Sequence, residues 1–592
     1  MSFILQFIRK HKLGCTLFAV VFYQILCALQ GVDLTDEGWG MYFYQQIFKN
    51  PECVTAQMPY WVTGLIGGIW DMLFPSGGFL WMRIFGIILT TGTFYLSYTF
   101  LKKSIASNWL LVGLVAQIVI VAGDPKPYGY NSLTAFFVLL AVMSLWRGLE
   151  RRKYVWLFIG GFLLGINVFV RIPNIAILPI ILLIPIYSYW QSKKIGLFSS
   201  QLWTAIVGII TGMGIVVLAM WHWGYWALFM ESFSAVANSA TDASNSHQFG
   251  RLITRYLLNY SGILIVGAVV TLVGCIYLWL YAKIRTKKIL YCLHVLCALI
   301  LVFGSMRYNE ILRDNDMFFA QFISYIGAIL ILINYNRSKC FHLRYAALAS
   351  LFMIVLIPLG SDQGVVTMWT SAWLALPLGA AYLYNLSKDG KLWESKLKRY
   401  FSYKSGIRSY LGILFLAYIG CGLYKNDNLA YYDPDSRLTK VHSIDNSYCR
   451  LIYTNSYRAR LINELLPALQ SYVKPNDYLM VYNFMPGLNY MTNTRSYVSN
   501  AWLWGLSGSE LKQQLDKSLS EKKILPVVVR QHFVAANKWQ EYDPFYTDAT
   551  RNPENVLSRN DQTKAFNDFL EQNHYITVWT NRNFEILLPE KP

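Results

Sequence analysis

Residues 256–282 read YLLNYSGILIVGAVVTLVGCIYLWLYA, a run of apolar and small polar residues without a charged side chain. A helix needs roughly 20 such residues to cross about 30 Å of hydrocarbon, and a closed helix satisfies its backbone groups there. The run therefore predicts a membrane-spanning helix. Similar stretches recur along the chain and bring the expected number of spans to about 13: 13–32, 84–101, 104–123, 127–146, 154–170, 172–192, within 195–230, 289–306, 317–336, 345–361, 363–387 and 409–424.

The composition of the whole chain agrees with this pattern. Of its 592 residues, 55% are hydrophobic and only 14% are charged, whereas soluble globular chains are about 25% charged. A wholly soluble protein, a disulfide-stapled secreted module and a disordered or collagenous chain are therefore excluded. The first apolar run is too long for a cleaved signal peptide, and we expect it to remain as the first span.

The net charge of +19 is distributed unevenly between the two sets of loops. Loops on the side of the N-terminus carry 25 basic and 3 acidic residues, whereas the opposite loops up to residue 424 carry 8 and 12. Positively charged loops stay in the cytoplasm, so this bias predicts a cytoplasmic N-terminus. The expected location is a bacterial inner membrane. The basic excess indicates topology and not binding of nucleic acid.

Residues 425–592 differ in character, with 19 basic and 18 acidic residues and short apolar runs. Strands are expected at 450–454, 478–482 and 525–530 and in a hairpin at 575–588, with helices at 456–471, 509–521 and 563–572. We therefore predict a polytopic all-α membrane domain, residues 1–424, followed by a small α/β soluble domain, residues 425–592, on the outer side.

The first outer loop, residues 31–80, contains the clearest candidate for chemistry. Asp33, Asp36 and Glu37 follow the first span directly, and amphipathic interfacial helices are expected at 41–48, 59–70 and 74–81. Carboxylates at a membrane surface are costly unless they are used or paired. The alternative is that the three acids are only an outer-surface charge excess.

The Asp36-Glu37 pair just past the first span resembles the acidic motif of the GT-C glycosyltransferases, and the overall plan is most similar to the aminoarabinose (lipid A) transferases and protein O-mannosyltransferases. The resemblance implies an inverting transfer of a sugar from a polyprenyl-phosphate donor to a lipid, glycan or protein acceptor. It assigns the general base to Asp36, because a hydroxyl nucleophile must lose its proton as the glycosidic bond forms. Glu37 would orient the acceptor or hold the loop. No metal is implied.

A transferase of this kind must also bind the donor phosphate, and arginine binds phosphate bidentately. Arginines at the expected outer ends of helices are candidates: Arg171, Arg251, Arg255, Arg307 and Arg313. Arg171 is the strongest, because it lies in a very short turn between two apolar stretches. The alternative for each is a contact with lipid headgroups.

Other outer residues are candidates for substrate binding. Asp124, Lys126 and Tyr128 lie in one Pro/Gly-rich segment that could also be an ordinary turn, and Asp362 interrupts two apolar stretches. His222 lies between two tryptophans, where interfacial anchoring is the alternative. Competing functions are a transporter or flippase of lipid-linked sugars and a cell-surface glycan polymerase or ligase. A Cys53–Cys449 disulfide is left open.

Overall fold

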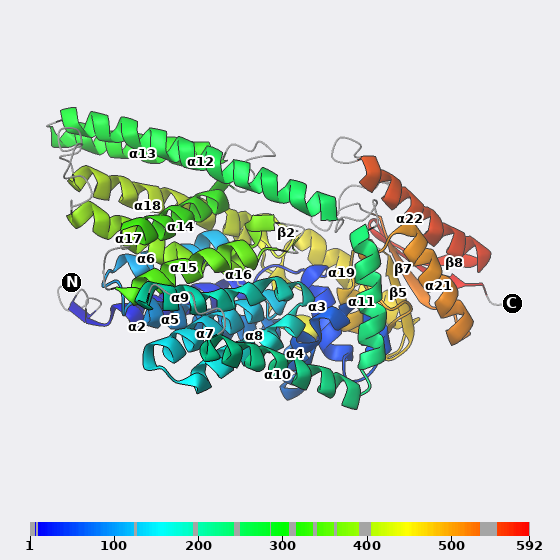
Figure 1. The fold of residues 1–592 in the computed structure, drawn as a ribbon. Coiled ribbons are helices and arrows are strands. Elements are labelled where there is room, and N and C mark those ends of the chain that lie inside the picture. The colour runs from blue at the N-terminus through cyan, green and yellow to red at the C-terminus, as the bar shows by residue number, and fades with distance from the viewer. Residues whose placement is uncertain are drawn as a thin grey trace.

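The computed structural model describes residues 6–7, 10–122, 127–192, 199–241, 249–284, 286–306, 315–334, 340–359, 361, 364–389, 404–482, 484–532 and 553–590. The described chain is mostly helical and carries a small β-sheet near its C-terminus. Its two ends lie at opposite ends of an elongated body, with most of the long helices running lengthwise between them (Figure 1).

Eight helical stretches in the described chain are long and apolar enough to cross a membrane: Pro75–Leu101, Tyr130–Arg151, Ile172–Ser192, Ser200–His222, Leu252–Lys283, Lys287–Gly304, Asp316–Asn334 and Ser405–Asn428. Four shorter apolar helices accompany them: Lys12–Ala28, Trp109–Ile120, Tyr154–Val170 and Phe341–Leu356. These stretches coincide with twelve of the apolar runs in the sequence. The exact number of thirteen spans and the orientation in the membrane stay predictions.

The thirteenth run, 363–387, does not form one continuous helix. It divides into η6 (Gly364–Thr367), α16 (Met368–Ser371) and α17 (Ala375–Asp389). Gly364 adopts a φ of +62°, a value that favours glycine and begins a short 3-10 turn instead of a long helix.

Close helix packing positions the C-terminal end of α8 (Tyr154–Val170). Gly161 and Gly165 of this helix face the backbone of α10 (Ser200–His222), and a Cβ at Gly161 would lie 2.0 Å from the Ala205 carbonyl oxygen. Gly208 and Gly212 of α10 face the backbone of α8 in the same way. Small residues four apart allow two helix backbones to approach, which fixes the position of the residue that ends α8, Arg171.

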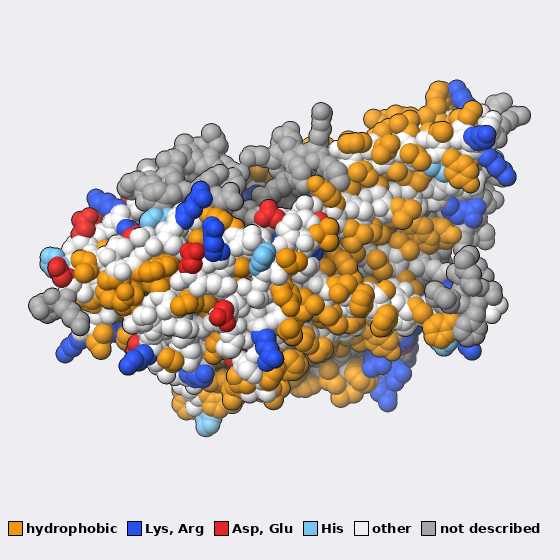
Figure 2. Space-filling model, turned by 180° about the vertical axis from the view of Figure 1, so that it is seen from behind, with side chains coloured by type: hydrophobic (Ala, Val, Ile, Leu, Met, Phe, Trp, Pro, Cys, Tyr) orange, Lys and Arg blue, Asp and Glu red, His pale blue; other side chains and the backbone are white. Residues whose placement is uncertain are grey.

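The surface divides into an apolar band and two polar ends. Figure 2 shows hydrophobic side chains over the helical part, whereas charged side chains gather on the C-terminal part and at the opposite end. Exposed large apolar residues occur along α10, α12 (Phe249–Lys283) and α13 (Lys287–Met306), including Leu218, Leu264 and Phe303. An apolar surface of this extent is typical of contact with lipid.

The C-terminal part contains a five-stranded sheet in the order β6-β5-β7-β9-β8. Its strands are β5 (Tyr478–Tyr482), β6 (Arg495–Ser496), β7 (Val527–Gln531), β8 (Tyr575–Thr580) and β9 (Phe584–Pro589). β5 pairs parallel with β6 and β7, and β9 pairs antiparallel with β7 and β8. The expected strands at 478–482 and 525–530 and the hairpin are confirmed.

The other expected elements of this part are present, although the last helix is longer and one strand is shorter than expected. The helices are α19 (Ser456–Gln470), α21 (Gly508–Lys522) and α22 (Pro553–Gln572). The expected strand at 450–454 shortens to β4 (Tyr453–Thr454), which pairs with β3 (His442–Ser443) outside the main sheet. The hairpin turns at Asn581, whose side-chain oxygen accepts hydrogen bonds from the backbone of Asn583 and Phe584.

The first loop lies between the helical part and the C-terminal sheet (Figure 1). It forms α3 (Asp36–Gln46), η1 (Pro51–Tyr60) and α4 (Trp61–Leu73). α3 crosses α20 (Gly487–Thr492) so closely that a Cβ at Gly38 would lie 2.7 Å from the Cα of Gly487. The expected interfacial helix at 41–48 is therefore wrong: α3 is buried, because the C-terminal part covers it. The boundary at 424/425 stays a prediction.

Candidate functional site

Asp33 organises the beginning of α3 with its side chain. Its Oδ1 accepts the backbone N–H of Thr35 at 2.7 Å, and its Oδ2 accepts that of Glu37 at 3.0 Å. These bonds satisfy donors that the start of a helix leaves unpaired. Burial, followed by the charges of Asp36 and Glu37, raises the pKa of Asp33 well above its ordinary value. Asp33 therefore has a structural role at the start of α3, and its contact with substrate stays a prediction.

Glu37 is buried in an ion pair with Arg83 of α5 (Gly78–Leu101). Arg83 Nε donates to Oε1 at 2.7 Å and Nη2 donates to Oε2 at 2.6 Å. Arg83 also donates to the carbonyls of Ala28 and Gly31, at 2.7 and 3.0 Å. Glu37 therefore holds the loop to two neighbouring segments, and its carboxylate is enclosed away from solvent.

Asp36, in contrast, is exposed. Residues three apart on a helix share a face, so Asp36 and Trp39 lie on the same side of α3, which is the side that solvent reaches. Trp39 donates its indole N–H to Asn500 Oδ1 at 3.1 Å, and its ring lies 5.9 Å from that of Trp502. The C-terminal part thus fixes the aromatic residue beside Asp36.

A row of half-exposed rings continues from Trp39 towards Arg171. The Trp39 ring meets that of Tyr60 edge-on at 5.9 Å, and Tyr60 stacks on Tyr130 at 4.7 Å with 23° between the planes. The guanidinium of Arg171 lies 5.8 Å from the centre of the Tyr130 ring. We call Trp39, Tyr60 and Tyr130 the aromatic row; it connects the exposed face of α3 with Arg171.

Arg171 ends α8 in an extended conformation and is only 8% exposed. Its Nη2 donates to the carbonyl of Ile357 at 3.2 Å, and its buried Nε has no hydrogen-bond partner among the described residues. No carboxylate pairs with it in that part of the chain. A buried cation normally has a counter-charge, so this site has the chemistry to take an anion.

Arg255 approaches the same segment from α12. It is exposed, and its Cγ lies 3.2 Å from the position of a Cβ on Gly364. Tyr256, the next residue, donates its hydroxyl to the carbonyl of Pro358. The described residues between Ile357 and Gly364 therefore connect Arg171 with Arg255, a pair of cations that the sequence separates by more than eighty positions.

The remaining expected site residues divide into three groups. Tyr128 is buried in the core, with its hydroxyl donated to the Thr63 carbonyl at 2.9 Å and its ring stacked on Phe85 at 4.4 Å; its contact with substrate stays a prediction. His222 is exposed at the end of α10, and its contact with substrate stays a prediction. Arg251 lies in α12 without a described side chain, and the other candidates lie outside the described residues: Asp124, Lys126, Arg307, Arg313 and Asp362.

Roles for Arg83 and for the aromatic row were not predicted from the sequence. Arg83 carries a signal, because a single arginine at the edge of an apolar stretch needs a partner. The sequence contains no signal for the aromatic row, because its rings come from three separate segments of a chain that is 16% aromatic. In the described chain, no group of three or more His, Cys, Asp or Glu side chains could hold a metal ion.

No protein-family model and no curated protein matches this chain. Among solved structures, it is similar to the oligosaccharyltransferase of Archaeoglobus fulgidus. The form tethered to an acceptor peptide containing the NVT sequon is 10% identical with a TM-score of 0.48, covering 99% of this chain and 75% of that one. The complex with an inhibitory peptide and a dolichol-phosphate is 11% identical with a TM-score of 0.46, covering 88% and 70%. Likeness at this level assigns neither a family nor an activity.

Proposed function

We propose that this protein is a membrane glycosyltransferase that moves a sugar from a polyprenyl-phosphate donor to an acceptor hydroxyl. The observation that carries the proposal is the aromatic row, which connects an exposed carboxylate, Asp36, with a buried cation, Arg171, that has no carboxylate partner among the described residues. A chain of ring contacts thus leads from the residue beside the proposed base to the proposed anion site. The acceptor is a lipid, a glycan or a protein, and the site lies on the outer face of a bacterial inner membrane.

The reaction requires a proton acceptor and a stabilised leaving group. Asp36 takes the proton of the acceptor hydroxyl while its oxygen attacks the anomeric carbon. The bond from this carbon to the phosphate oxygen breaks, and the electron pair leaves with the polyprenyl phosphate. Attack from the face opposite the phosphate inverts the anomeric configuration. Arg171, assisted by Arg255, stabilises the charge that grows on the departing phosphate.

The aromatic row suits a sugar that lies between these groups. A pyranose ring has apolar C–H faces, and flat side chains that are half-exposed can cover such a face without losing contact with water. Trp39 and Tyr130 stand at the two ends of the row. A donor sugar packed along it would have its phosphate at Arg171 and its anomeric carbon on the side of Asp36.

The test is transfer by the purified protein in detergent, with a panel of synthetic polyprenyl-phosphate monosaccharides. Release of polyprenyl phosphate in the presence of a hydroxyl acceptor is measured, because every productive donor yields this product. The Asp36→Asn variant should release it about 10²- to 10⁴-fold more slowly, which is the usual contribution of a general base. Because Asp36 is exposed, the variant should fold normally.

Asp516→Asn is the matched control, since Asp516 is also exposed but lies on α21, away from the aromatic row. It should retain wild-type turnover. Equal turnover of the Asp36→Asn variant and the wild-type protein would remove Asp36 as the base. Movement of labelled donor across vesicles, without any release of polyprenyl phosphate, would instead identify a transporter of lipid-linked sugars.

A further inference from the structure

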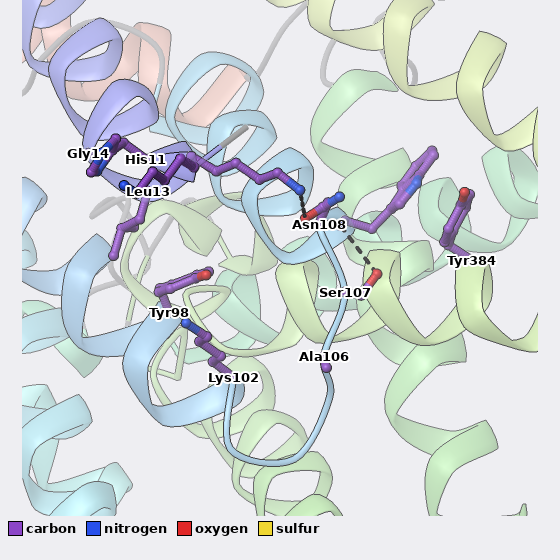
Figure 3. Close-up of a pocket in the computed structure, with 12 residues that line it drawn as sticks. His11, Leu13, Gly14, Tyr98, Lys102, Ala106, Ser107, Asn108 and Tyr384 are labelled. Atoms are coloured by element: carbon purple, nitrogen blue, oxygen red, sulfur yellow. Dashed lines mark hydrogen bonds between the residues drawn. The ribbon is translucent and has the colours of Figure 1, made fainter. Parts of the chain in front are cut away.

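A cavity of about 700 Å³ lies at the end of the molecule opposite the C-terminal part. α2 (Lys12–Ala28) begins at this cavity and α5 ends there, whereas the other ends of both helices lie beside the C-terminal part. Figure 3 shows His11, Tyr98 and Lys102 on one side of the cavity, with Ser107, Asn108 and Tyr384 on the other. None of these residues belongs to the site proposed for transfer.

The lining of the cavity is strongly basic. Lys10, Lys12 and Lys102 contribute to it together with His11, and no carboxylate lines it in the described part of the chain. Lys12 Nζ donates to Asn108 Oδ1 at 3.1 Å, which places this ammonium inside the opening. Three ammonium groups around one cavity repel one another, so an anion that enters it relieves this repulsion.

Neutral donors and aromatic rings complete the lining. Ser107 and Asn108 provide hydroxyl and amide groups that can bind phosphate or glycerol oxygens. Trp109 stacks on Tyr384 at 4.7 Å, and both rings face the cavity. Rings of this kind are enriched where hydrocarbon meets the headgroup layer, which is the depth that a lipid phosphate occupies.

An apolar stripe leads from the cavity along α2. Gly14 lines the cavity and nothing lies within 4 Å of the position of a Cβ on it. Phe18 and Phe22 follow at intervals of four residues, so they share the face of Gly14; they are 74% and 54% exposed. A soluble anion has no apolar part that could pack against this stripe, whereas the acyl chains of a lipid would pack against it.

From these features we propose that the cavity binds the headgroup of an anionic phospholipid, with the phosphate among Lys10, Lys12 and Lys102 and the acyl chains along Phe18 and Phe22. Such a lipid would fasten the beginning of α2 to the 102–109 connection between α5 and α6 (Trp109–Ala116). Basic pockets between helices are a recurring way to bind anionic lipids. This binding does not depend on the proposed transfer activity.

The test is lipid retention by the full-length protein, measured by native mass spectrometry after extraction from nanodiscs of phosphatidylglycerol or phosphatidylcholine. The wild-type protein should retain phosphatidylglycerol in preference to phosphatidylcholine. The double variant Lys12→Gln/Lys102→Gln should bind phosphatidylglycerol about 30-fold more weakly, from roughly 1 kcal/mol for each cation removed. Gly14→Trp should give a similar loss by filling the cavity without a change of charge.

Lys287→Gln/Lys288→Gln is the matched control, because both lysines are exposed at the same end of the molecule but do not line the cavity. It should retain phosphatidylglycerol like the wild-type protein. Equal retention of phosphatidylcholine, or equal loss in the control and in the cavity variants, would overturn the proposal. Displacement of the lipid by millimolar inorganic phosphate would also overturn it, because the site would then bind a soluble anion.

Discussion

Glu37 and Arg83 form a bidentate ion pair in which both side chains are almost completely buried, with N–O distances of 2.7 and 2.6 Å. Arg83 also lies 3.7 Å from the ring centre of Tyr431, which follows α18 (Lys404–Asn428). One guanidinium therefore joins the end of α2, the start of α3 and the first residues of the C-terminal part. The exposed Asp36 is held beside this junction.

Glu37→Gln should destabilise the protein by about 3–5 kcal/mol, because it leaves the positive charge of Arg83 buried without a counter-charge. The fall in Tm is measured in detergent. Glu231→Gln is the control: its partner Lys517 lies at 2.9 Å, but both side chains are about half-exposed, and such pairs contribute at most about 1 kcal/mol. Loss of transfer by Glu37→Gln at unchanged Tm would show that Glu37 acts in catalysis and not in holding the loop.

The elements that the sequence predicts best are those that carry a local pattern. The strand at 478–482 is a short apolar run, and the hairpin carries its turn signal at Asn581–Asn583. Most of the apolar helices follow from length and hydrophobicity alone, whereas the run 363–387 divides into η6, α16 and α17. These features need no information from distant parts of the chain.

The arrangement of the site could not be predicted in this way. Glu37 and Arg83 are 46 positions apart, and Trp39 and Asn500 are 461 apart. The motif marks Asp33, Asp36 and Glu37 as equally acidic, but burial separates them into a helix cap, an exposed carboxylate and an ion-pair partner. Only the tertiary packing of the C-terminal part on α3 makes that distinction.

Gly38→Ala tests this packing directly. The added Cβ would lie 2.7 Å from both Cα and N of Gly487, which are backbone atoms and cannot rotate away. The backbone N–H of Gly487 donates to the Leu34 carbonyl at 2.9 Å, so a displacement would also strain this bond. We expect a loss of about 1–3 kcal/mol, seen as a lower Tm and faster proteolysis.

Gly214→Ala is the matched control in α10, because nothing lies within 4 Å of the position of a Cβ there. This variant should be unchanged or slightly more stable, since alanine is the better helix former. Similar losses of stability in the two variants would mean that the approach of α3 to α20 is not the cause.

Glu585 of β9 should make the stability of the C-terminal part depend on pH. Burial alone would raise its pKa, but hydrogen bonds from His532 and Arg530 and the charge of Arg530 lower the pKa to about 2, from 4.5 in the unfolded chain. The stabilisation, about 3 kcal/mol, is present above about pH 4.5 and is lost as the pH falls towards 2. Glu585→Gln should therefore lower Tm at pH 7, and the difference from wild type should shrink below pH 4.5.

Glu590→Gln provides the control for this pH series, because Glu590 is exposed immediately after the same strand. Its Tm should follow that of the wild-type protein at every pH. A constant difference between Glu585→Gln and wild type from pH 7 to pH 3 would show that another property of the substitution, and not ionisation of Glu585, causes the loss.

Arg171→Lys separates a phosphate-binding role from contact with lipid headgroups. Lysine keeps the charge and an aliphatic stem, but a single ammonium cannot make the two parallel bonds of a guanidinium to phosphate. We expect the variant to fold, with the fall in kcat at least as large as the rise in KM for a polyprenyl-phosphate sugar, because the leaving phosphate gains charge in the transition state. Steady-state kinetics on the purified protein measure both constants.

Arg255→Lys is the companion variant, and guanidinium rescue distinguishes the two positions. Arg255 is exposed, so a lysine there keeps most of its long-range attraction for phosphate and should change turnover by less than Arg171→Lys. Arg171→Ala removes a side chain that is only 8% exposed and leaves a space into which free guanidinium fits, so added guanidinium should restore part of the lost turnover. Unchanged kinetics in Arg171→Lys, together with no rescue of Arg171→Ala, would reduce Arg171 to an anchor for Ile357 and transfer the phosphate-binding role to Arg255.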